Sequence, residues 1–171
     1  MPESLREYHA KRDFAQTTEP SGESEARRKG DEPIFVIQRH DASTLHYDFR
    51  LEVDGVLVSW AVPKGLPQKT GVRRLAVRTE DHPLAYANFE GRIPKGQYGA
   101  GQVKIWDNGV YRNLRAEKDE RASMADAIAE GKIEVHLEGE QVKGPYALIR
   151  TDSEEDNWII LRMKAGDAGE Q

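Results

Sequence analysis

The chain contains no cysteine among its 171 residues. This absence excludes disulfide bonds, thiolate zinc sites and a cysteine nucleophile. A metal ion in this protein would have to bind His, Asp, Glu or backbone oxygen atoms. A cysteine-free composition also fits a reducing compartment, so we expect a cytoplasmic protein.

Long apolar runs are also absent. No stretch reaches the ~18 apolar residues of a membrane-spanning helix. The N-terminal residues 1–6 lack the apolar core of a signal peptide. We therefore expect no membrane association, and a chain of 171 residues that forms one domain with a hydrophobic core.

The sequence has no overall excess of positive charge, because its net charge is −5. A protein that binds nucleic acid usually carries a basic surface. One segment, residues 62–79, contains no acid and holds the basic residues Lys64, Lys69, Arg73, Arg74 and Arg78. Such a local patch can hold a phosphate backbone, although the same charges also fit a solvated loop.

The composition divides the chain into three parts. Residues 1–32 are polar and poor in aliphatic side chains, which predicts an irregular N-terminal arm that Tyr8 and Phe14 could dock. Residues 33–164 hold the apolar patterns of an ordered domain. Residues 165–171 are expected to form a flexible tail.

The best-defined element is a hairpin around Asp54-Gly55, a favoured two-residue turn. It joins predicted strands at 46–53 and 56–62 and places Phe49 opposite Trp60. In the same register, small residues lie opposite the polar residues of the first strand, which leaves space for a ligand.

The remaining pattern predicts many short strands and one short helix. The helix runs over 123–130, with Ser123 as its N-cap and Gly131 after its end. Asn108-Gly109 predicts a second hairpin, with Trp106 opposite Tyr111. Further strands are expected at 34–40, 74–79, 101–106, 110–113, 132–138, 146–151 and 158–163. This order is typical of a mostly β, antiparallel barrel or sandwich.

One face of the predicted strand 46–53 carries His46, Asp48 and Arg50, because side chains alternate along a strand. The opposite face is apolar and belongs to the core. If residues 41–45 form the preceding loop, His40 lies opposite His46. His40, His46 and Asp48 then form a two-histidine, one-carboxylate set that suits Mn, Fe or Zn.

The same residues also allow simpler interpretations. A loop shorter by one residue would turn the two imidazoles to different faces and leave them as ordinary strand residues. Arg50 can bind a phosphate or carboxylate beside the metal, or it can form a salt bridge with Asp48.

A third histidine, His82, follows the basic segment and precedes Pro83, which favours an extended conformation. We expect His82 in a loop, where it binds phosphate, donates a proton or is merely exposed. The glycine-rich residues 91–101 lack the ending of a P-loop and predict a tight crossing between strands.

Four segments together resemble the 3′-phosphoesterase domain of bacterial DNA ligase D. They are His40–Leu51, Trp60–Gly65, Asp81–Pro83 and Ile93–Gly101. The spacing His-x5-His-x-Asp-x-Arg, followed by the other motifs, is a specific combination. The resemblance extends from about Lys11 to Met163. Because a ligase or polymerase domain does not fit within these 171 residues, we expect the stand-alone form.

The resemblance implies an antiparallel β-barrel with its site in a surface groove. It implies a manganese-dependent phosphodiesterase and phosphomonoesterase, with other divalent transition metals as alternatives. The substrate would be the 3′ end of a DNA or DNA–RNA primer–template. Removal of a terminal ribonucleoside leaves a 3′-phosphate, and removal of that phosphate leaves a 3′-hydroxyl for end joining. A separate DNA ligase and other end-joining proteins would be its partners.

The resemblance also implies roles for individual residues. The metal ligands would be His40, His46 and Asp48. The residues implied at or near the phosphate are Arg50, His82 and Tyr86. Positions that support activity in the family match Lys64, Arg74 and Glu80. The N-terminal element linked to ribonucleoside removal matches Arg12, Asp13 and Glu19.

Two other functions fit parts of the pattern. A non-haem iron oxygenase also uses two histidines and a carboxylate, and it would consume oxygen without needing a DNA end. A non-catalytic module for nucleic-acid ends would bind without turnover and would tolerate metal removal. The basic segment and Arg50 fit the oxygenase less well.

Overall fold

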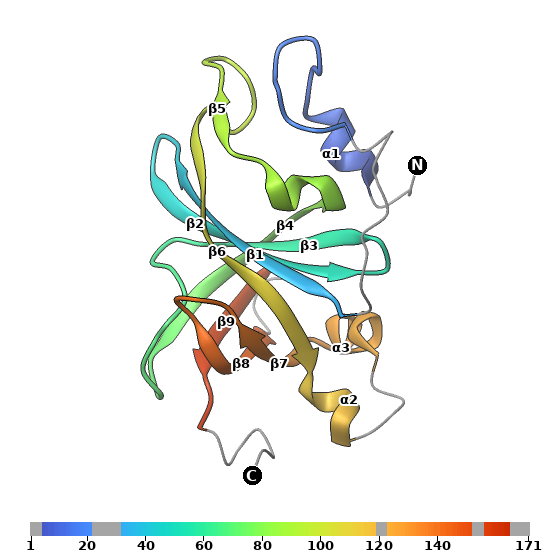
Figure 1. Ribbon diagram of the computed structural model, residues 1–171, viewed down its shortest axis with the longest axis vertical. Coiled ribbons are helices and arrows are strands. Elements are labelled where there is room, and N and C mark those ends of the chain that lie inside the picture. Colours follow the sequence, from blue (N-terminus) through green and yellow to red (C-terminus); the bar gives the residue numbers. More distant parts are fainter. Residues whose placement is uncertain (1–4, 22–31, 119–122, 152–155, 165–171) are drawn as a thin grey trace.

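The computed structural model describes residues 5–21, 32–118, 123–151 and 156–164. Its core is an antiparallel β-barrel, as predicted (Figure 1). The strand order is β1-β2-β3-β4-β9-β8-β7-β6, and β6 pairs with β1 to close the ring. The strands are β1 (Ile34–Asp41), β2 (Leu45–Val53), β3 (Val56–Val62), β4 (Arg73–Pro83), β5 (Gly91–Ile93), β6 (Gly101–Asn113), β7 (Lys132–Glu138), β8 (Lys143–Arg150) and β9 (Asn157–Arg162). The short β5 pairs with one end of β6.

The β2–β3 hairpin has the predicted register. Val53 pairs with Val56 and Phe49 pairs with Trp60. Asp54 and Gly55 form the turn with positive φ angles of 51° and 86°, as this tight turn requires. The apolar face of the hairpin lies inside the barrel, where the Trp60 and Trp158 rings are 5.5 Å apart in an edge-to-face contact.

The predicted helix is α3 (Met124–Glu130). The Ser123 hydroxyl accepts a hydrogen bond from the Asp126 amide, and Gly131 ends the helix in the left-handed conformation. The structure adds three short helical segments, which are α1 (Arg6–Ala10), the 3-10 helix η2 (Leu84–Asn88) and α2 (Leu114–Lys118). Figure 1 shows α2 and α3 at the lower end of the barrel, away from α1 and β5.

The second predicted hairpin is wrong, because β6 runs without interruption through Asn108-Gly109. Asn108 pairs with Val36 of β1, next to a bulge. Gly109 does not form a turn; it allows β6 and β7 to approach each other closely. A Cβ atom at this position would lie 2.0 Å from the carbonyl oxygen of Glu138. A side chain at this position would clash with the neighbouring strand, so only glycine fits.

An outer layer covers one side of the barrel wall and includes the arm, η2 and β5 (Figure 1). It is held by a second apolar cluster made of Tyr8, Val36, Leu57, Tyr86, Ala87, Phe89, Ile93 and Val103. Tyr8 is fully buried and its hydroxyl donates to the carbonyl of Pro20, while Phe14 packs at the edge of the cluster. The described part of the arm, residues 5–21, is thus docked on the barrel.

The proposed tail, 165–171, and arm residues 1–4 and 22–31 lie outside the described residues. None of the helices in the described part of the chain has the length and apolar character needed to cross a bilayer.

The role of Gly109 can be tested by comparing two alanine variants. We expect Gly109→Ala to lower the free energy of unfolding by about 2–4 kcal/mol, because the strand must move away from Glu138. Asn108→Ala, at an exposed position, should change it by less than about 0.5 kcal/mol. Urea denaturation measures both. Similar losses in the two variants would contradict this account of β6.

Candidate functional site

The candidate site is a cavity of about 270 Å³ between the outer face of the barrel and the covering layer. Residues from β1, β2 and β4 form its wall, and the arm, η2 and the loop 94–100 close around it. The cavity collects most of the candidates from the sequence, namely Arg12, His40, His46, Asp48, Arg50, Glu80, His82 and Tyr86.

The two histidines share one face, as the longer loop predicted. His40 pairs directly with His46, and Gln38 pairs with Asp48 in the same ladder. One ligand atom from each of His40, His46 and Asp48 lies within 4.8 Å of the others. This separation is compatible with three ligands of one ion.

The hydrogen bonds of both imidazoles support this interpretation. His40 Nε2 lies 2.6 Å from the Gly99 carbonyl oxygen, and His46 Nδ1 lies 3.3 Å from that of Thr44. Because a carbonyl only accepts, these nitrogens carry protons. The other nitrogens, His40 Nδ1 and His46 Nε2, lie 3.4 and 3.1 Å from the Asp48 carboxylate. Metal-binding histidines usually donate their outer N–H in this way, so the residues fit a metal centre.

Asp48 is buried, and burial alone would raise the pKa of its carboxyl. The adjacent Arg50 guanidinium and the hydrogen bonds to His40 and His46 outweigh burial and hold this pKa well below its usual range. Asp48 is therefore ionised at neutral pH. A buried, ionised carboxylate beside two imidazole nitrogens is a favourable oxygen donor for a divalent ion.

Arg50 lies beside Asp48 and is only 3% exposed. Its Nε donates to the Gln38 side-chain oxygen at 2.7 Å, and Nη2 lies 3.4 Å from Asp48. The guanidinium carbon also lies 4.8 Å from the centre of the Tyr86 ring. The salt bridge to Asp48 considered from the sequence is thus present. Arg50 also lines the cavity, where a fixed guanidinium can receive an anion.

His82 lies on β4 and not in a loop, which corrects the prediction. Ser59 pairs with Thr79, whereas Leu57 pairs with His82, so β4 contains one extra residue between these pairs. Regular alternation from Thr79 would place Asp81 on the site face. The bulge places His82 there instead, as bulges near functional sites often do.

The environment of His82 keeps the imidazole neutral. Burial lowers the pKa of His82 well below its usual value, and the nearby Arg50 and Arg12 charges lower it further. Nδ1 lies 2.9 Å from the Glu80 carbonyl oxygen and therefore carries the proton. Arg12 Nη2 lies 3.4 Å from Nε2 and donates to it. The unprotonated Nε2 of His82 therefore faces Arg12 of the arm.

The arm contributes a buried ionic network to the site. Arg12 contacts Glu19 at 3.1 Å and Glu80 at 3.2 Å, and the three side chains are 4%, 0% and 2% exposed. The Tyr86 hydroxyl donates to the same Glu19 carboxylate. Burial raises the pKa of Tyr86 well above its usual value, so this hydroxyl stays protonated. The arm and the barrel therefore share one set of buried charges.

Comparison with known proteins decides the family. The sequence model described as "DNA Ligase D 3'-phosphoesterase domain" matches residues 38–150. The chain is 47% identical over 172 aligned residues to the multifunctional non-homologous end joining protein LigD of Pseudomonas aeruginosa, covering 98% of the chain and 20% of the relative. It is 49% identical over 164 residues to the LigD proteins of Mycobacterium tuberculosis and of Mycolicibacterium smegmatis, covering 96% of the chain and 20% and 21% of those proteins.

The chain belongs to the DNA ligase D 3′-phosphoesterase domain family. The resemblance seen in the sequence is thereby confirmed. The chain spans about a fifth of the length of the curated relatives that it matches, 20% for the first two.

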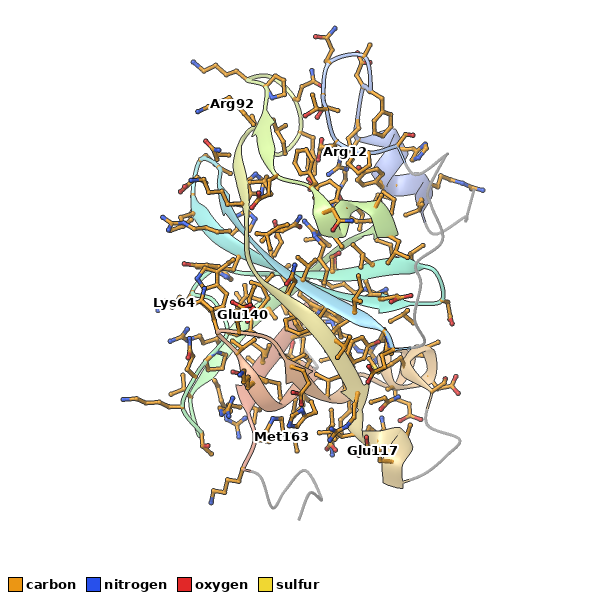
Figure 2. All side chains as sticks on the ribbon, in the orientation of Figure 1. Arg12, Lys64, Arg92, Glu117, Glu140 and Met163 are labelled. Atoms are coloured by element: carbon orange, nitrogen blue, oxygen red, sulfur yellow. The ribbon has the colours of Figure 1, made fainter. Side chains whose placement is uncertain are left out.

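Four of the predicted site residues do not line the cavity of this phosphoesterase domain. Glu19 is one of them, because its buried side chain contacts Arg12 and Tyr86 and does not reach the cavity. Asp13 is exposed and its carboxylate accepts a hydrogen bond from the Ala15 amide, so it shapes a turn of the arm. Lys64 and Arg74 line a different cavity at the end of the barrel. In Figure 2, Arg12 lies between the arm and the barrel, whereas Lys64 lies lower, beside the strands.

Several residues at the site were missed from the sequence. Gln38 is two positions before His40 and so lies on the same strand face, a signal that was available. Gly99 and Tyr98 come from the glycine-rich loop, and Lys11 from the arm contacts Glu80 at 3.2 Å. Their positions depend on long-range packing, which no local pattern indicates.

Glu19 provides a test of the buried network. We expect Glu19→Ala to lower the free energy of unfolding by about 3–5 kcal/mol, because it leaves the Arg12 charge buried without this partner. Glu7 offers a matched control, since it contacts Lys11 at 3.0 Å but is 62% exposed. Glu7→Ala should cost at most about 1 kcal/mol. Equal losses in denaturant unfolding would show that the arm is not held by this network.

Proposed function

We propose that this chain heals the 3′ ends of DNA during end joining. It removes a 3′-terminal ribonucleoside and then the 3′-phosphate, leaving a hydroxyl that a ligase can use. The family and the names of the relatives, which are end-joining proteins, support the general role in DNA end processing. The decisive observation is that His40, His46 and Asp48 meet in one cavity with Arg50 beside them.

His40, His46 and Asp48 are the residues that would hold a divalent ion, for which the family resemblance favours Mn²⁺. Such an ion, when bound, polarises a phosphate oxygen and lowers the pKa of a coordinated water. A donor set of two imidazoles and a carboxylate also suits Fe²⁺ and Zn²⁺.

Arg50 binds the phosphate group in this proposal. Its guanidinium is fixed by Gln38 and by the Tyr86 ring, so it is already oriented before the substrate arrives. It neutralises the charge that grows on the phosphate oxygens in the transition state. The Tyr86 ring packs against the Arg50 guanidinium and helps to position it.

His82 serves as a hydrogen-bond acceptor at the phosphate in this proposal. Its Nε2 holds no proton in the folded protein, because Nδ1 donates to Glu80 and Arg12 donates to Nε2. Nε2 can accept a hydrogen bond from a phosphate hydroxyl or an attacking water when Arg12 turns from it toward the substrate.

The arm supports ribonucleoside removal. Arg12 lines the cavity and is held there by Glu19 and Glu80, so these three residues can orient a terminal nucleoside. A terminal phosphate without a nucleoside needs no such contact. Asp13 then acts through the shape of the arm, since its carboxylate caps a turn. Lys64 and Arg74 act at a distance from the cleaved bond.

The partners follow from this function. The substrate is the 3′ end of a DNA or DNA–RNA primer–template, and a separate DNA ligase and other end-joining proteins act with the enzyme in the cytoplasm. The family match favours hydrolysis over the iron oxygenase. A polar catalytic set beside the metal ligands favours turnover over a module that only binds ends.

The central test uses a primer–template with one 3′-terminal ribonucleotide and a second with a 3′-phosphate. With Mn²⁺, both should be converted to 3′-hydroxyl ends, and a chelator should stop both reactions. Asp48→Ala should lower both rates by about 10³-fold, because the ligand set is broken. Asp41→Ala removes an exposed carboxylate on the neighbouring strand and should leave both rates within about twofold of wild type. Full phosphatase activity in Asp48→Ala would refute this scheme.

Arg12→Ala separates the two activities. We expect ribonucleoside removal to fall about tenfold or more, the effect of losing a hydrogen bond from a charged group. Phosphate removal should stay within about threefold, since Arg50 carries that contact. Arg92→Ala, an exposed change on β5, is the control. Equal losses of both activities in Arg12→Ala would contradict the assigned role of the arm.

A further inference from the structure

A second cavity of about 420 Å³ opens at the end of the barrel, separate from the metal-ligand cavity. Two aromatic side chains, Tyr47 and Trp106, line it with their rings 5.8 Å apart in an edge-to-face contact. Its basic lining residues are Lys64, Lys69 and Arg74, and no carboxylate lines it. The volume lies in the range of small-molecule sites.

The cations of this cavity are available to a ligand. Among the residues that the structure describes, no carboxylate forms an ion pair with Lys64, Lys69 or Arg74. Arg74 is oriented by its own backbone neighbours, because Nη1 donates to the carbonyls of Lys64 and Gly65 at 2.7 and 3.1 Å. Both bonds use Nη1, so the remaining donors of the guanidinium can bind an anion.

Gly65 completes the cavity wall. It adopts a φ of +78°, and a Cβ atom there would lie 3.3 Å from the Tyr47 ring. The absent side chain lets the 63–66 turn approach this ring and place Lys64 beside it. The cavity therefore combines aromatic surface with fixed positive charge.

The position of this cavity connects it with the catalytic cavity. Tyr47 follows His46 and precedes Asp48 on β2, and it points to the opposite face of the strand. The two cavities thus lie on either side of the same strand end.

A larger cavity, of about 680 Å³, is less suited to hold the rest of an anionic strand that leaves the catalytic cavity. It shares Glu80 and Tyr98 with the catalytic site. However, its lining includes the carboxylates of Glu7, Asp81 and Asp156 as well. Lys11, Arg78 and Arg150 also line it, so its charge is mixed. The charged residues that line the barrel-end cavity are all cations, which favours phosphate groups there.

We propose that the barrel-end cavity binds one nucleotide of the polynucleotide whose 3′ end occupies the catalytic cavity. The base would pack against Trp106 and Tyr47, and the adjoining phosphate would contact Lys69, Lys64 and Arg74. Aromatic stacking with a basic rim is the usual way to hold a single-stranded nucleotide without reading its sequence. This inference rests on the proposed function. It places in the barrel-end cavity a part of the substrate that lies away from the cleaved bond.

The first test measures binding without turnover. A fluorescent oligonucleotide is titrated with wild type, Lys69→Gln, Trp106→Leu and the control Lys143→Gln, an exposed change on β8. Lys69→Gln should reduce the salt dependence of log Kd by about one, and Lys143→Gln should leave it unchanged. Trp106→Leu should weaken binding about tenfold, within the range for loss of one stacked base. An unchanged salt dependence in Lys69→Gln would overturn the proposal, even if Trp106→Leu fails to fold.

The second test compares two substrates with the same 3′ end, a dinucleotide and a twelve-nucleotide strand. Wild type should process the longer strand with a lower KM. Lys69→Gln should lose this advantage, and Lys143→Gln should keep it. If Lys69→Gln is active and still prefers the twelve-nucleotide strand as strongly as wild type, the role given to the barrel-end cavity would be wrong. The proposed function would remain intact. Oligonucleotide binding that responds to Lys69→Gln, without any turnover, would support the cavity and refute the proposed function. If a free mononucleotide fills the site at Trp106 without displacing the oligonucleotide, the cavity does not hold a nucleotide of the substrate strand, and the proposal would be overturned.

Discussion

The site depends on a carboxylate that is buried and still ionised. Asp48 lies on the outer face of the barrel wall, where the arm and η2 exclude water from it. Such a charge is tolerated only with partners that supply positive charge or hydrogen bonds. Arg50, His40 and His46 provide these from the same two strands, and their own positions are fixed in turn by Gln38 and by backbone carbonyls.

Strand alternation explains how one hairpin serves both the core and the chemistry. Along β2, apolar side chains fill the barrel, while the polar set faces outward. An outward polar face would ordinarily be solvated. Here the covering layer has an apolar cluster of its own, so the polar set between the two cores is buried. The arm is therefore a structural part of the site, and the Arg12, Glu19 and Glu80 network joins it to β4.

Much of this arrangement could be predicted because it is local. The Asp54-Gly55 turn fixes the register of β2 and β3. The sequence left two registers open for β1 and β2, and the structure has the one that pairs His40 with His46. The barrel and the family membership followed from the same segments. The hairpin predicted at Asn108-Gly109 is absent because Gly109 instead lets β6 pass close to Glu138.

Other features arise from contacts between distant segments. The bulge in β4 that turns His82 to the site, and the Gly99 carbonyl that orients His40, leave no local signature in the sequence. The separation of Lys64 and Arg74 from the other candidates also depends on the closed barrel, which places opposite faces of β2 in different cavities.

The most direct measurement is anomalous diffraction at the manganese edge from crystals grown with Mn²⁺. The account predicts a single strong peak bounded by His40 Nδ1, His46 Nε2 and an Asp48 carboxylate oxygen. A peak at other residues, with these three side chains still bonded only to one another, would contradict it.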